Sequence, residues 1–243
     1  MHQSTIDALK TFQEKGNLIF IASARGSLPE TIKGIDFDGF IGNDGHYITY
    51  KDEVWLDDLF TIQDVKHQIE VYKKYHGRYM FSGHDAGWNC FWEDEYIQKH
   101  SKMFHHTTKK PDYIIEDYQE EDVHAIACCV LFENADDLYG AYHELKDDYT
   151  MVVYDTGLIR MDVYRKGFRK GTACEYVYQK LGICKEDTYA FGDGVNDVEM
   201  IQLVGHGVAM GNAVEELKEV ADEVTLSVDD HGIAAYFDKY LNK

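Results

Sequence analysis

The segment Tyr189 to Met200, YAFGDGVNDVEM, holds two aspartates four residues apart around a glycine-flanked turn. The apolar residues before Asp193 predict a buried strand, and the residues from Asn196 onward predict a helix. This order places Asp193 and Asp197 at the carboxyl edge of a parallel sheet, where open α/β sheets bind ligands. Two carboxylates there suit Mg²⁺, which takes one or two protein carboxylates and leaves its other positions to water and phosphate. Turn formation by Asp193 and helix capping by Asp197 are the alternative.

Two further segments carry groups that would hold an anion. Lys170 starts a helix predicted over 170–181, so its ammonium and the nearby N–H groups would face a bound anion. Ser23 ends the apolar strand predicted in Asn17 to Ser23, NLIFIAS, where its hydroxyl and the next N–H groups would bind a phosphate oxygen. A solvated basic loop and a simple cap are the respective alternatives.

The composition indicates a folded, acidic protein. Its 243 residues are 44% hydrophobic and 14% aromatic, enough for one large domain or two smaller ones. The formal net charge of -20 opposes binding to nucleic acid and to anionic membrane surfaces. The N-terminus lacks a signal-peptide pattern, and no stretch approaches the ~18 apolar residues of a membrane span. We therefore expect a cytoplasmic monomer or weak homodimer whose partner is a small anionic molecule.

Two kinds of pattern divide the chain. Residues 1–50 and 158–243 alternate amphipathic helices with short apolar strands, which is typical of an α/β fold with a doubly wound, mainly parallel, Rossmann-like sheet. Residues 51–157 are aromatic and polar, and their order of strands and helices predicts a small α+β layer with an antiparallel sheet. The simplest organisation is a core built from 1–50 and 158–243, with a domain inserted at 51–157.

In this order, the motifs resemble those of the haloacid dehalogenase (HAD) superfamily of phosphatases. The most similar branch is the Cof-like one, which carries an α/β cap between its second and third motifs. FIASARG resembles the second motif, FRKG the third, and FGDGVNDVEMI followed by GVAMGNA the fourth. The segment DDHGIAAYFDKYL resembles the family's last helix. The resemblance covers nearly the whole chain, loosely in the cap and specifically at the fourth motif.

The resemblance implies a Mg²⁺-dependent phosphatase acting on a small phosphorylated metabolite, such as a sugar phosphate or a flavin-pathway phosphate. In that family an aspartate attacks phosphorus to form an aspartyl-phosphate, and a second aspartate two residues later is the general acid and base. The cap would close over the core and select the leaving group. The implied catalytic residues are Lys170, Asp193 and Asp197, with Asp193 and Asp197 on the metal, Asp197 directly or through water. The implied phosphoryl-binding residues are Ser23, Lys170, Asn196 and Arg25.

One segment matches the family's nucleophile motif, DxDG followed by Thr or Ser, but in the wrong place. Asp36 and Asp38 in GIDFDGF follow Ser23 in the chain, whereas the family's motif precedes the second motif. No buried strand leads into them, and Phe40 replaces the hydroxyl residue. We interpret this match as coincidental.

The chain as given therefore lacks the nucleophile, the general acid and the first core strand that carries them. Without that strand, the backbone groups of its neighbours would be unpaired and an apolar space unfilled. Two explanations stay open: a start assigned too late or a truncated chain of a working enzyme, and a catalytically inactive HAD-like protein that binds Mg²⁺ or phosphates. Phosphomutase activity would use the same intermediate, but no residue points to it.

The turn at residues 42–45, GNDG, differs from the Asn-Gly usual in related sequences. Asp44 adds a negative charge near the entrance of the expected site. Most aspartates in turns only form the turn.

Overall fold

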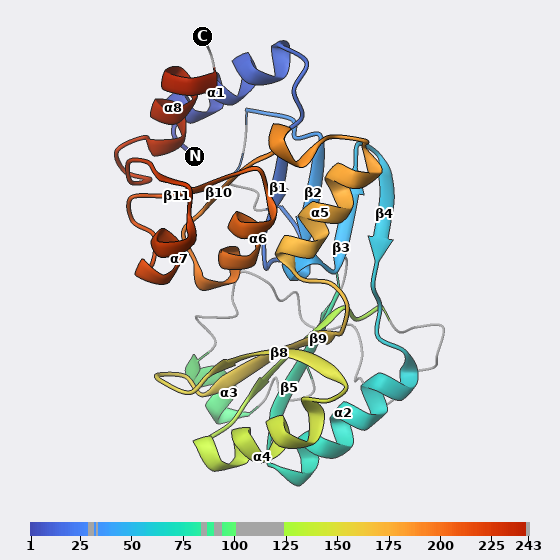
Figure 1. Ribbon diagram of the computed structural model, residues 1–243. Coiled ribbons are helices and arrows are strands. Elements are labelled where there is room, and N and C mark those ends of the chain that lie inside the picture. Colours follow the sequence, from blue (N-terminus) through green and yellow to red (C-terminus); the bar gives the residue numbers. More distant parts are fainter. Residues whose placement is uncertain (29–31, 33, 84–86, 90–93, 101–123, 242–243) are drawn as a thin grey trace. The chain divides into compact units, whose positions relative to one another are not determined.

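The computed structural model describes residues 1–28, 32, 34–83, 87–89, 94–100 and 124–241 (Figure 1). The chain forms two compact units. The first unit is Met1–Leu56 with Phe168–Lys243, and the second is Asp57–Gly167. The second unit is thus an insertion into the first, and the α/β class with an inserted α+β unit agrees with the sequence-based prediction.

The first unit contains two separate sheets. The four-stranded sheet has the order β1-β2-β3-β4, with strands Phe20–Ala22, Gly39–Gly42, Tyr47–Tyr50 and Glu53–Asp57. The three-stranded sheet has the order β10-β11-β12, with strands Tyr189–Gly192, His206–Ala209 and Glu223–Val224. β1 and β2 are parallel, β10 to β12 are all parallel, and β3 is antiparallel to β2. The sequence predicted a doubly wound sheet that lacks its first core strand, and the described strands leave an interruption between β1 and β10.

Helices cover both faces of these strands (Figure 1). On one face, α5 and α6 pack against Ala22 of β1 and Ala190 of β10. On the other face, α1 and α8 pack against Ile19, just before β1, and Phe191 of β10. Successive residues of a strand point to opposite faces, so each strand contributes to both layers. The helices of this unit are α1 (Gln3–Glu14), α5 (Lys170–Lys180), α6 (Val198–Leu203), α7 (Glu215–Val220) and α8 (Gly232–Tyr236).

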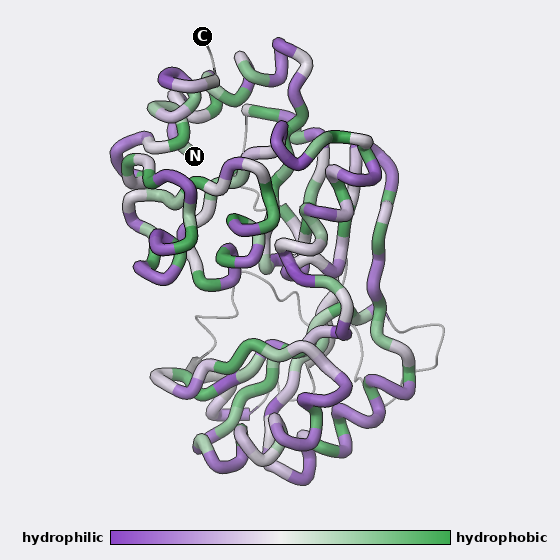
Figure 2. The backbone as a smooth tube through the Cα atoms, in the orientation of Figure 1, coloured by the Kyte–Doolittle hydropathy of each residue, from purple (hydrophilic) through white to green (hydrophobic). Residues whose placement is uncertain are grey.

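The second unit is an antiparallel sheet packed against two helices. Its strand order is β6-β5-β7-β9-β8, and the strands are Arg78–Ser82 (β5), Gly87–Asn89 (β6), Ala127–Leu131 (β7), Tyr149–Tyr154 (β8) and Arg160–Arg165 (β9). The helices are α2 (Ile62–Lys74), α3 (Glu95–His100) and α4 (Ala135–Leu145). α2 and α4 bury their apolar sides on the sheet, and Figure 2 shows hydrophilic and hydrophobic residues alternating along α2.

The borders of the inserted unit differ from those expected at 51 and 157. β4 lies beside β3 in the four-stranded sheet, so residues 51–56 belong to the first unit. β9 pairs with β7 and β8, so residues 158–167 belong to the second. Both segments have strand-like sequences, and a strand's own sequence does not specify which sheet it joins.

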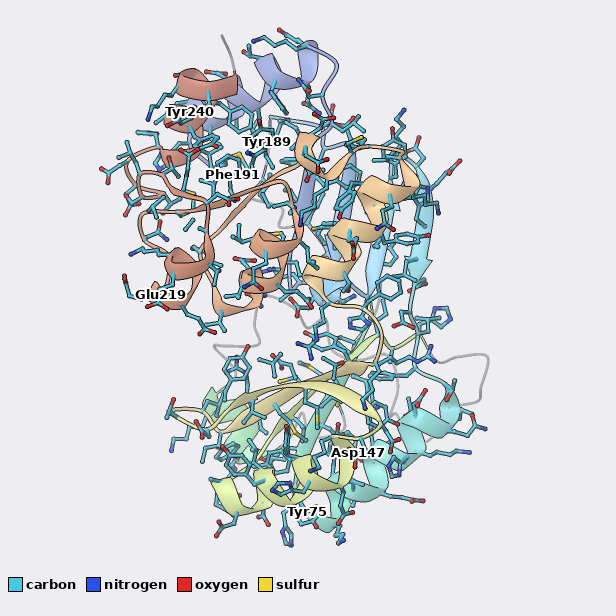
Figure 3. The ribbon with its side chains drawn as sticks, viewed as in Figure 1. Tyr75, Asp147, Tyr189, Phe191, Glu219 and Tyr240 are labelled. Carbon is cyan, nitrogen blue, oxygen red and sulfur yellow. The ribbon has the colours of Figure 1, made fainter. Side chains whose placement is uncertain are left out.

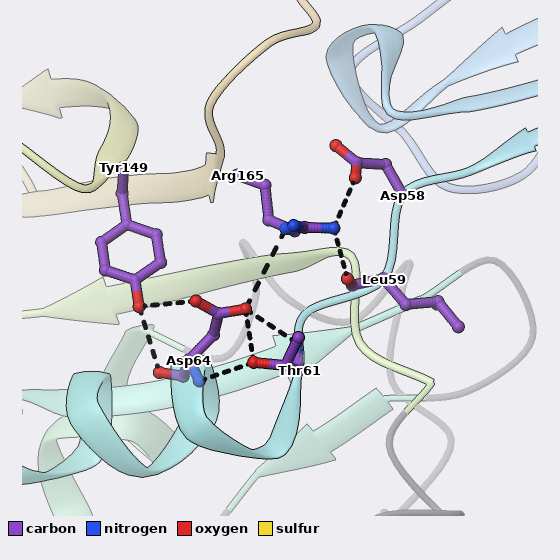
Figure 4. Close-up of polar contacts among 6 residues, drawn as sticks. All are labelled: Asp58, Leu59, Thr61, Asp64, Tyr149 and Arg165. Atoms are coloured by element: carbon purple, nitrogen blue, oxygen red, sulfur yellow. Dashed lines mark hydrogen bonds and ion pairs between the residues drawn. The ribbon is translucent and has the colours of Figure 1, made fainter.

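Hydrogen bonds from Arg165 link the two ends of the second unit to each other (Figure 4). Its Nη1 donates to Oδ1 of Asp58 at 3.0 Å and to the carbonyl oxygen of Leu59 at 3.2 Å. Nearby, Asp64 forms a capping box with Thr61 at the start of α2 and accepts a hydrogen bond from the Tyr149 hydroxyl at 3.0 Å. Chain entry and exit are therefore held together at the base of this sheet.

No helix within the described ranges is both long and apolar enough to cross a lipid bilayer.

Candidate active site

Lys170 and Asp197 form a buried ion pair. Lys170 is the first residue of α5, and Asp197 ends the short 3₁₀ turn before α6. Nζ of Lys170 lies 2.6 Å from Oδ1 of Asp197, and the two residues are 5% and 7% exposed. Oδ2 of Asp197 accepts hydrogen bonds from the N–H groups of Asp193 and Gly194, both at 3.0 Å. Both oxygens of Asp197 are thus engaged by donors, as a buried charge requires.

Asp193 is exposed at the tip of β10, next to this pair. Its N–H group donates to Asp197, which fixes the backbone of the loop. Its Oδ2 accepts a hydrogen bond from Nδ2 of Asn212 at 3.1 Å. Asn212 lies at the end of the GVAMGNA segment, just after β11, and no role was predicted for it from the sequence. The side-chain amide of Asn212 thus donates to the carboxylate of Asp193, which the motif predicts as functional.

The turn after β2 connects Ser23 to the loop that follows β10. The N–H of Asp44 donates to the carbonyl oxygen of Ser23 at 3.1 Å, and Nδ2 of Asn196 donates to Oδ1 of Asp44 at 3.0 Å. Asp44 has φ 55 and ψ 30, a left-handed conformation that aspartate tolerates better than most residues. Asp44 is therefore more than a turn former, because its carboxylate holds a residue of the fourth motif.

A glycine brings this turn against the start of α5. Gly45 has φ +108, and a Cβ on it would lie 2.4 Å from the carbonyl carbon of Arg169 and 2.9 Å from the backbone nitrogen of Lys170. Only a residue without a side chain permits this approach. The turn that carries Asp44 thus packs directly on the backbone that presents Lys170.

These contacts join most of the residues expected at the site. Ser23 is linked to Asn196 through Asp44, and Lys170 is linked to Asp193 through Asp197. Arg25 contributes its backbone: its N–H donates to the Ser23 hydroxyl at 3.1 Å, and its carbonyl oxygen accepts the N–H of Asn43 at 2.9 Å. The Arg25 side chain is exposed, and no contact ties its guanidinium to the other site residues among those described.

Asp38 lies at the other end of the parallel pair. Its Oδ2 accepts hydrogen bonds from the N–H of Ile19 at 2.8 Å and from Nε2 of Gln13 at 2.9 Å. Ile19 precedes β1 and Ser23 follows it, so Asp38 is at the amino edge and the candidate site at the carboxyl edge. This position, away from the candidate site, supports the interpretation of GIDFDGF as a coincidental match.

Cys174 of α5 is close to the ion pair but does not have the character of a nucleophile. Burial raises the pKa of its thiol to about 12, with Lys170 lowering it and Asp197 raising it. A thiol with such a pKa carries almost no thiolate near neutral pH. Cys174 is therefore a packing residue between α5 and its neighbours.

The oxygen atoms at this site suit a magnesium ion that is bound by one protein carboxylate. Within the described residues, no three His, Cys, Asp or Glu side chains gather as a protein-only metal site would need. Mg²⁺ usually keeps several waters and binds one or two carboxylates together with substrate phosphate, so Asp193 at the exposed loop tip fits it. Asp197 already shares both oxygens with Lys170 and the loop backbone, which favours an indirect role.

Known proteins resemble this chain in sequence and in fold. The family model of the haloacid dehalogenase-like hydrolases matches residues 1–237. "Putative phosphatase YkrA" of Bacillus subtilis (strain 168) is 28% identical over 239 residues, which cover 96% of this chain and 88% of that protein.

Solved structures show the same fold over the full chain. A hypothetical protein from Geobacillus kaustophilus HTA426 is 27% identical with a TM-score of 0.85, covering 100% of this chain and 93% of that chain. The HAD subclass IIB sugar phosphatase BT4131 is 26% identical with a TM-score of 0.78 and the same coverage, 100% and 93%. The chain therefore belongs to the haloacid dehalogenase-like hydrolases, in their Cof-like phosphatase branch.

Proposed function

We propose that this protein is a Mg²⁺-dependent phosphatase for a small phosphorylated metabolite, and that sugar phosphates are the first class to test. The observation that supports this most is the buried Lys170–Asp197 pair directly beside Asp193. The similarity to a sugar phosphatase at 26% identity supports the substrate class.

Lys170 has the role of holding a phosphoryl oxygen. Its ammonium is kept in place by Asp197, and Asp197 is kept in place by two backbone N–H groups. A cation fixed in this way stabilises negative charge without having to reorganise during the reaction. The ammonium group of Lys170 is thus held in position before a substrate binds.

Asp193 has the role of metal ligand, and Asn212 orients its carboxylate from the side. When bound, Mg²⁺ supplies neutralisation of the charge on the transferring phosphoryl group. In this proposal Asp197 would reach the metal through a bound water, since its own oxygens are engaged by Lys170 and the loop backbone.

Ser23 and Asn196 complete the phosphoryl-binding set. The Ser23 hydroxyl accepts the N–H of Arg25, which leaves its own proton to be donated to a phosphate oxygen. Asn196 is oriented by Asp44, so one of its amide hydrogens is already used. Arg25 would assist from its exposed position at the tip of β1.

A second candidate function is binding of Mg²⁺ and phosphates without turnover. The family's reaction passes through an aspartyl-phosphate, and the described strands leave an interruption between β1 and β10 where a strand with that aspartate would lie. The expectation that a nucleophile segment precedes Met1 stays a prediction. The roles of the second unit as a cap, the cytoplasmic location and the monomeric or weakly dimeric state are also predictions.

Hydrolysis of p-nitrophenyl phosphate and a panel of sugar phosphates separates the two candidates. Turnover that needs Mg²⁺, is lost in Asp193→Asn and is kept in Glu219→Gln supports the phosphatase. Glu219 is an exposed carboxylate on α7 and serves as the matched control (Figure 3). No turnover, but calorimetric Mg²⁺ binding that Asp193→Asn removes, supports the binding protein or a phosphatase whose nucleophile segment is missing from the chain tested. Absence of both signals contradicts both.

A further inference from the structure

Three residues lie in a row along the carboxyl edge of the three-stranded sheet. Asp193 follows β10 directly, Asn212 follows β11, and Val228 follows β12. Because these strands are parallel, their carboxyl ends lie at the same edge, so three loops from separate parts of the chain meet there (Figure 1). The side chain of Asn212 hydrogen-bonds to both of the other residues.

The two ends of the Asn212 amide have partners of opposite kind. Its Nδ2 donates to Oδ2 of Asp193 at 3.1 Å, and its Oδ1 accepts the N–H of Val228 at 2.9 Å. A backbone N–H group only donates, and an ionised carboxylate only accepts. One orientation of the amide therefore satisfies both neighbours, and the N–H of Val228 determines that the NH₂ group faces Asp193.

The loop that carries this amide is held on both sides by backbone hydrogen bonds. The N–H of Gly211 donates to the carbonyl oxygen of Leu226 at 3.0 Å, and the N–H of Val214 donates to the carbonyl oxygen of Asp193 at 3.1 Å. A Cβ on Gly211 would lie 2.7 Å from the backbone nitrogen of Ser227, so only glycine permits this approach. The loop after β11 thus connects the segment after β12 to Asp193.

A tight turn holds the N–H of Val228 in place. The hydroxyl of Ser227 accepts the N–H of Asp230 at 3.1 Å and donates to its Oδ2 at 2.6 Å. The carbonyl oxygen of Ser227 accepts the N–H of Gly232 at 2.9 Å. The side chain of Val228 is exposed. The contact of this residue with the amide is therefore made by its backbone alone.

This arrangement has a consequence for the carboxylate of Asp193. Its Oδ2 is engaged by Asn212, and no contact of the described residues engages its Oδ1. Carboxylates that bind a metal ion are commonly hydrogen-bonded by neighbouring groups, which fix their orientation, and loss of such a partner typically weakens metal binding 10–100-fold. The hydrogen bond from Asn212 thus leaves Oδ1 of Asp193 to bind a cation.

We propose that Asn212 is a positioning residue for the metal ligand Asp193, and that the backbone N–H of Val228 sets its orientation. We call the two hydrogen bonds that join Val228, Asn212 and Asp193 the positioning chain. The inference rests on the proposed role of Asp193 as metal ligand. It adds that the segment 225–230 affects metal affinity through its backbone, although its side chains take no part in the proposed chemistry.

Mg²⁺ titration of the full chain, followed by the NMR signal of the Gly194 amide, tests the role of Asn212. We expect Asn212→Ala to raise the Kd for Mg²⁺ by about 10-fold. Asn17→Ala is the matched control, because Asn17 is an exposed asparagine before β1 whose Nδ2 donates to the carbonyl oxygen of Phe12, away from the site. It should leave the Kd unchanged.

The two ways to fail are distinguishable. Wild-type protein that binds no Mg²⁺ contradicts the proposed function and the positioning chain with it. Wild-type protein that binds Mg²⁺ with the same Kd as Asn212→Ala contradicts the positioning chain alone.

A pair of substitutions at Val228 separates its backbone from its side chain. Val228→Pro removes the N–H that donates to Asn212, whereas Val228→Ala keeps it. We expect Val228→Pro to raise the Kd roughly 3-fold, less than the loss of Asn212 itself, and Val228→Ala to leave it unchanged. In the Asn212→Ala background, Val228→Pro should have no further effect, because its only route to Asp193 is already broken. An equal effect of the proline in both backgrounds overturns the proposal.

A spectroscopic measurement follows the positioning chain without a proline, and it decides the matter where thermal unfolding shows that Val228→Pro is not folded. Mg²⁺ should shift the amide signal of Val228 in the wild type and much less in Asn212→Ala. The amide of Val214 donates to the backbone of Asp193 and should respond to Mg²⁺ in both proteins. No shift at Val228 in the wild type, or the same shift in Asn212→Ala, contradicts the proposal.

Discussion

The ammonium of Lys170 and the carboxylate of Asp197 meet at 2.6 Å in the interior of the first unit, although 27 positions separate them in the chain. The pair joins the start of α5 to the loop after β10. Because the loop backbone donates to the same carboxylate, the cation, the carboxylate and Asp193 form one connected group. A substitution in this group should therefore affect the stability of the fold as well as the activity.

Removal of one member of this pair should destabilise the protein more than removal of both charges. Lys170→Met leaves the Asp197 carboxylate buried without its cation, and the expected loss is about 3–5 kcal/mol of unfolding free energy. In Lys170→Met with Asp197→Asn, the buried charge is gone, so part of the loss should be recovered. Urea unfolding of the wild type, both single variants and the double variant measures the coupling. Strictly additive effects would show that the two charges do not interact.

The Asp44 carboxylate should affect anion binding through its charge and through Asn196. Asp44→Asn keeps an acceptor for Asn196 and tolerates the left-handed backbone, so removing the charge should strengthen phosphate binding by roughly 3-fold at low salt. Asp44→Ala frees Asn196 and strains the backbone, which should weaken binding and cost about 1 kcal/mol of stability. Titration calorimetry with inorganic phosphate checks both. Tighter binding in both variants would mean that Asn196 needs no support.

Gly45 should be among the least replaceable residues of the first unit. An alanine there would keep φ +108 and bring its Cβ to 2.4 Å from the backbone of Arg169, so we expect a loss of about 3 kcal/mol or more. Gly16→Ala is the matched control, because Gly16 has φ +88 but nothing within 4 Å of the added Cβ. It should cost only about 1 kcal/mol. Similar losses in thermal or urea unfolding would show that Gly45 is needed only for its φ.

The buried thiol of Cys174 should make the protein less stable in alkali. Burial raises its pKa from the ordinary value of 9.0 to about 12, so the folded state keeps the proton while the unfolded chain loses it above about pH 9. Unfolding is then favoured as pH rises from about 9 toward 12, by at most about 1.4 kcal/mol per pH unit. In Cys174→Ala, the loss of unfolding free energy between about pH 8 and pH 10 should be smaller. Equal slopes in the two proteins would contradict this prediction.

The sequence by itself determined the local parts of the site. A buried strand, a glycine-flanked loop and a helix start are set by neighbouring residues, so the positions of Asp193, Asp197 and Lys170 at element ends followed from the chain. The order of the motifs identified the family. The mismatch of Asp36 and Asp38 was also visible, because order along the chain and the absence of a strand before them are local facts.

Only the tertiary structure decided which distant residues meet. The bonds from Asn212 to Asp193 and from Asn196 to Asp44 join loops from different parts of the chain, and no local pattern specifies them. The same holds for β4 and β9, whose sequences are strand-like but whose sheets differ from those expected. Strand pairing depends on backbone hydrogen bonds that every residue offers, so side-chain patterns predict that a strand forms but not its neighbour. The lack of a core strand was expected from the order of the motifs, but only the structure shows which of the described strands, β1 and β10, flank the interruption.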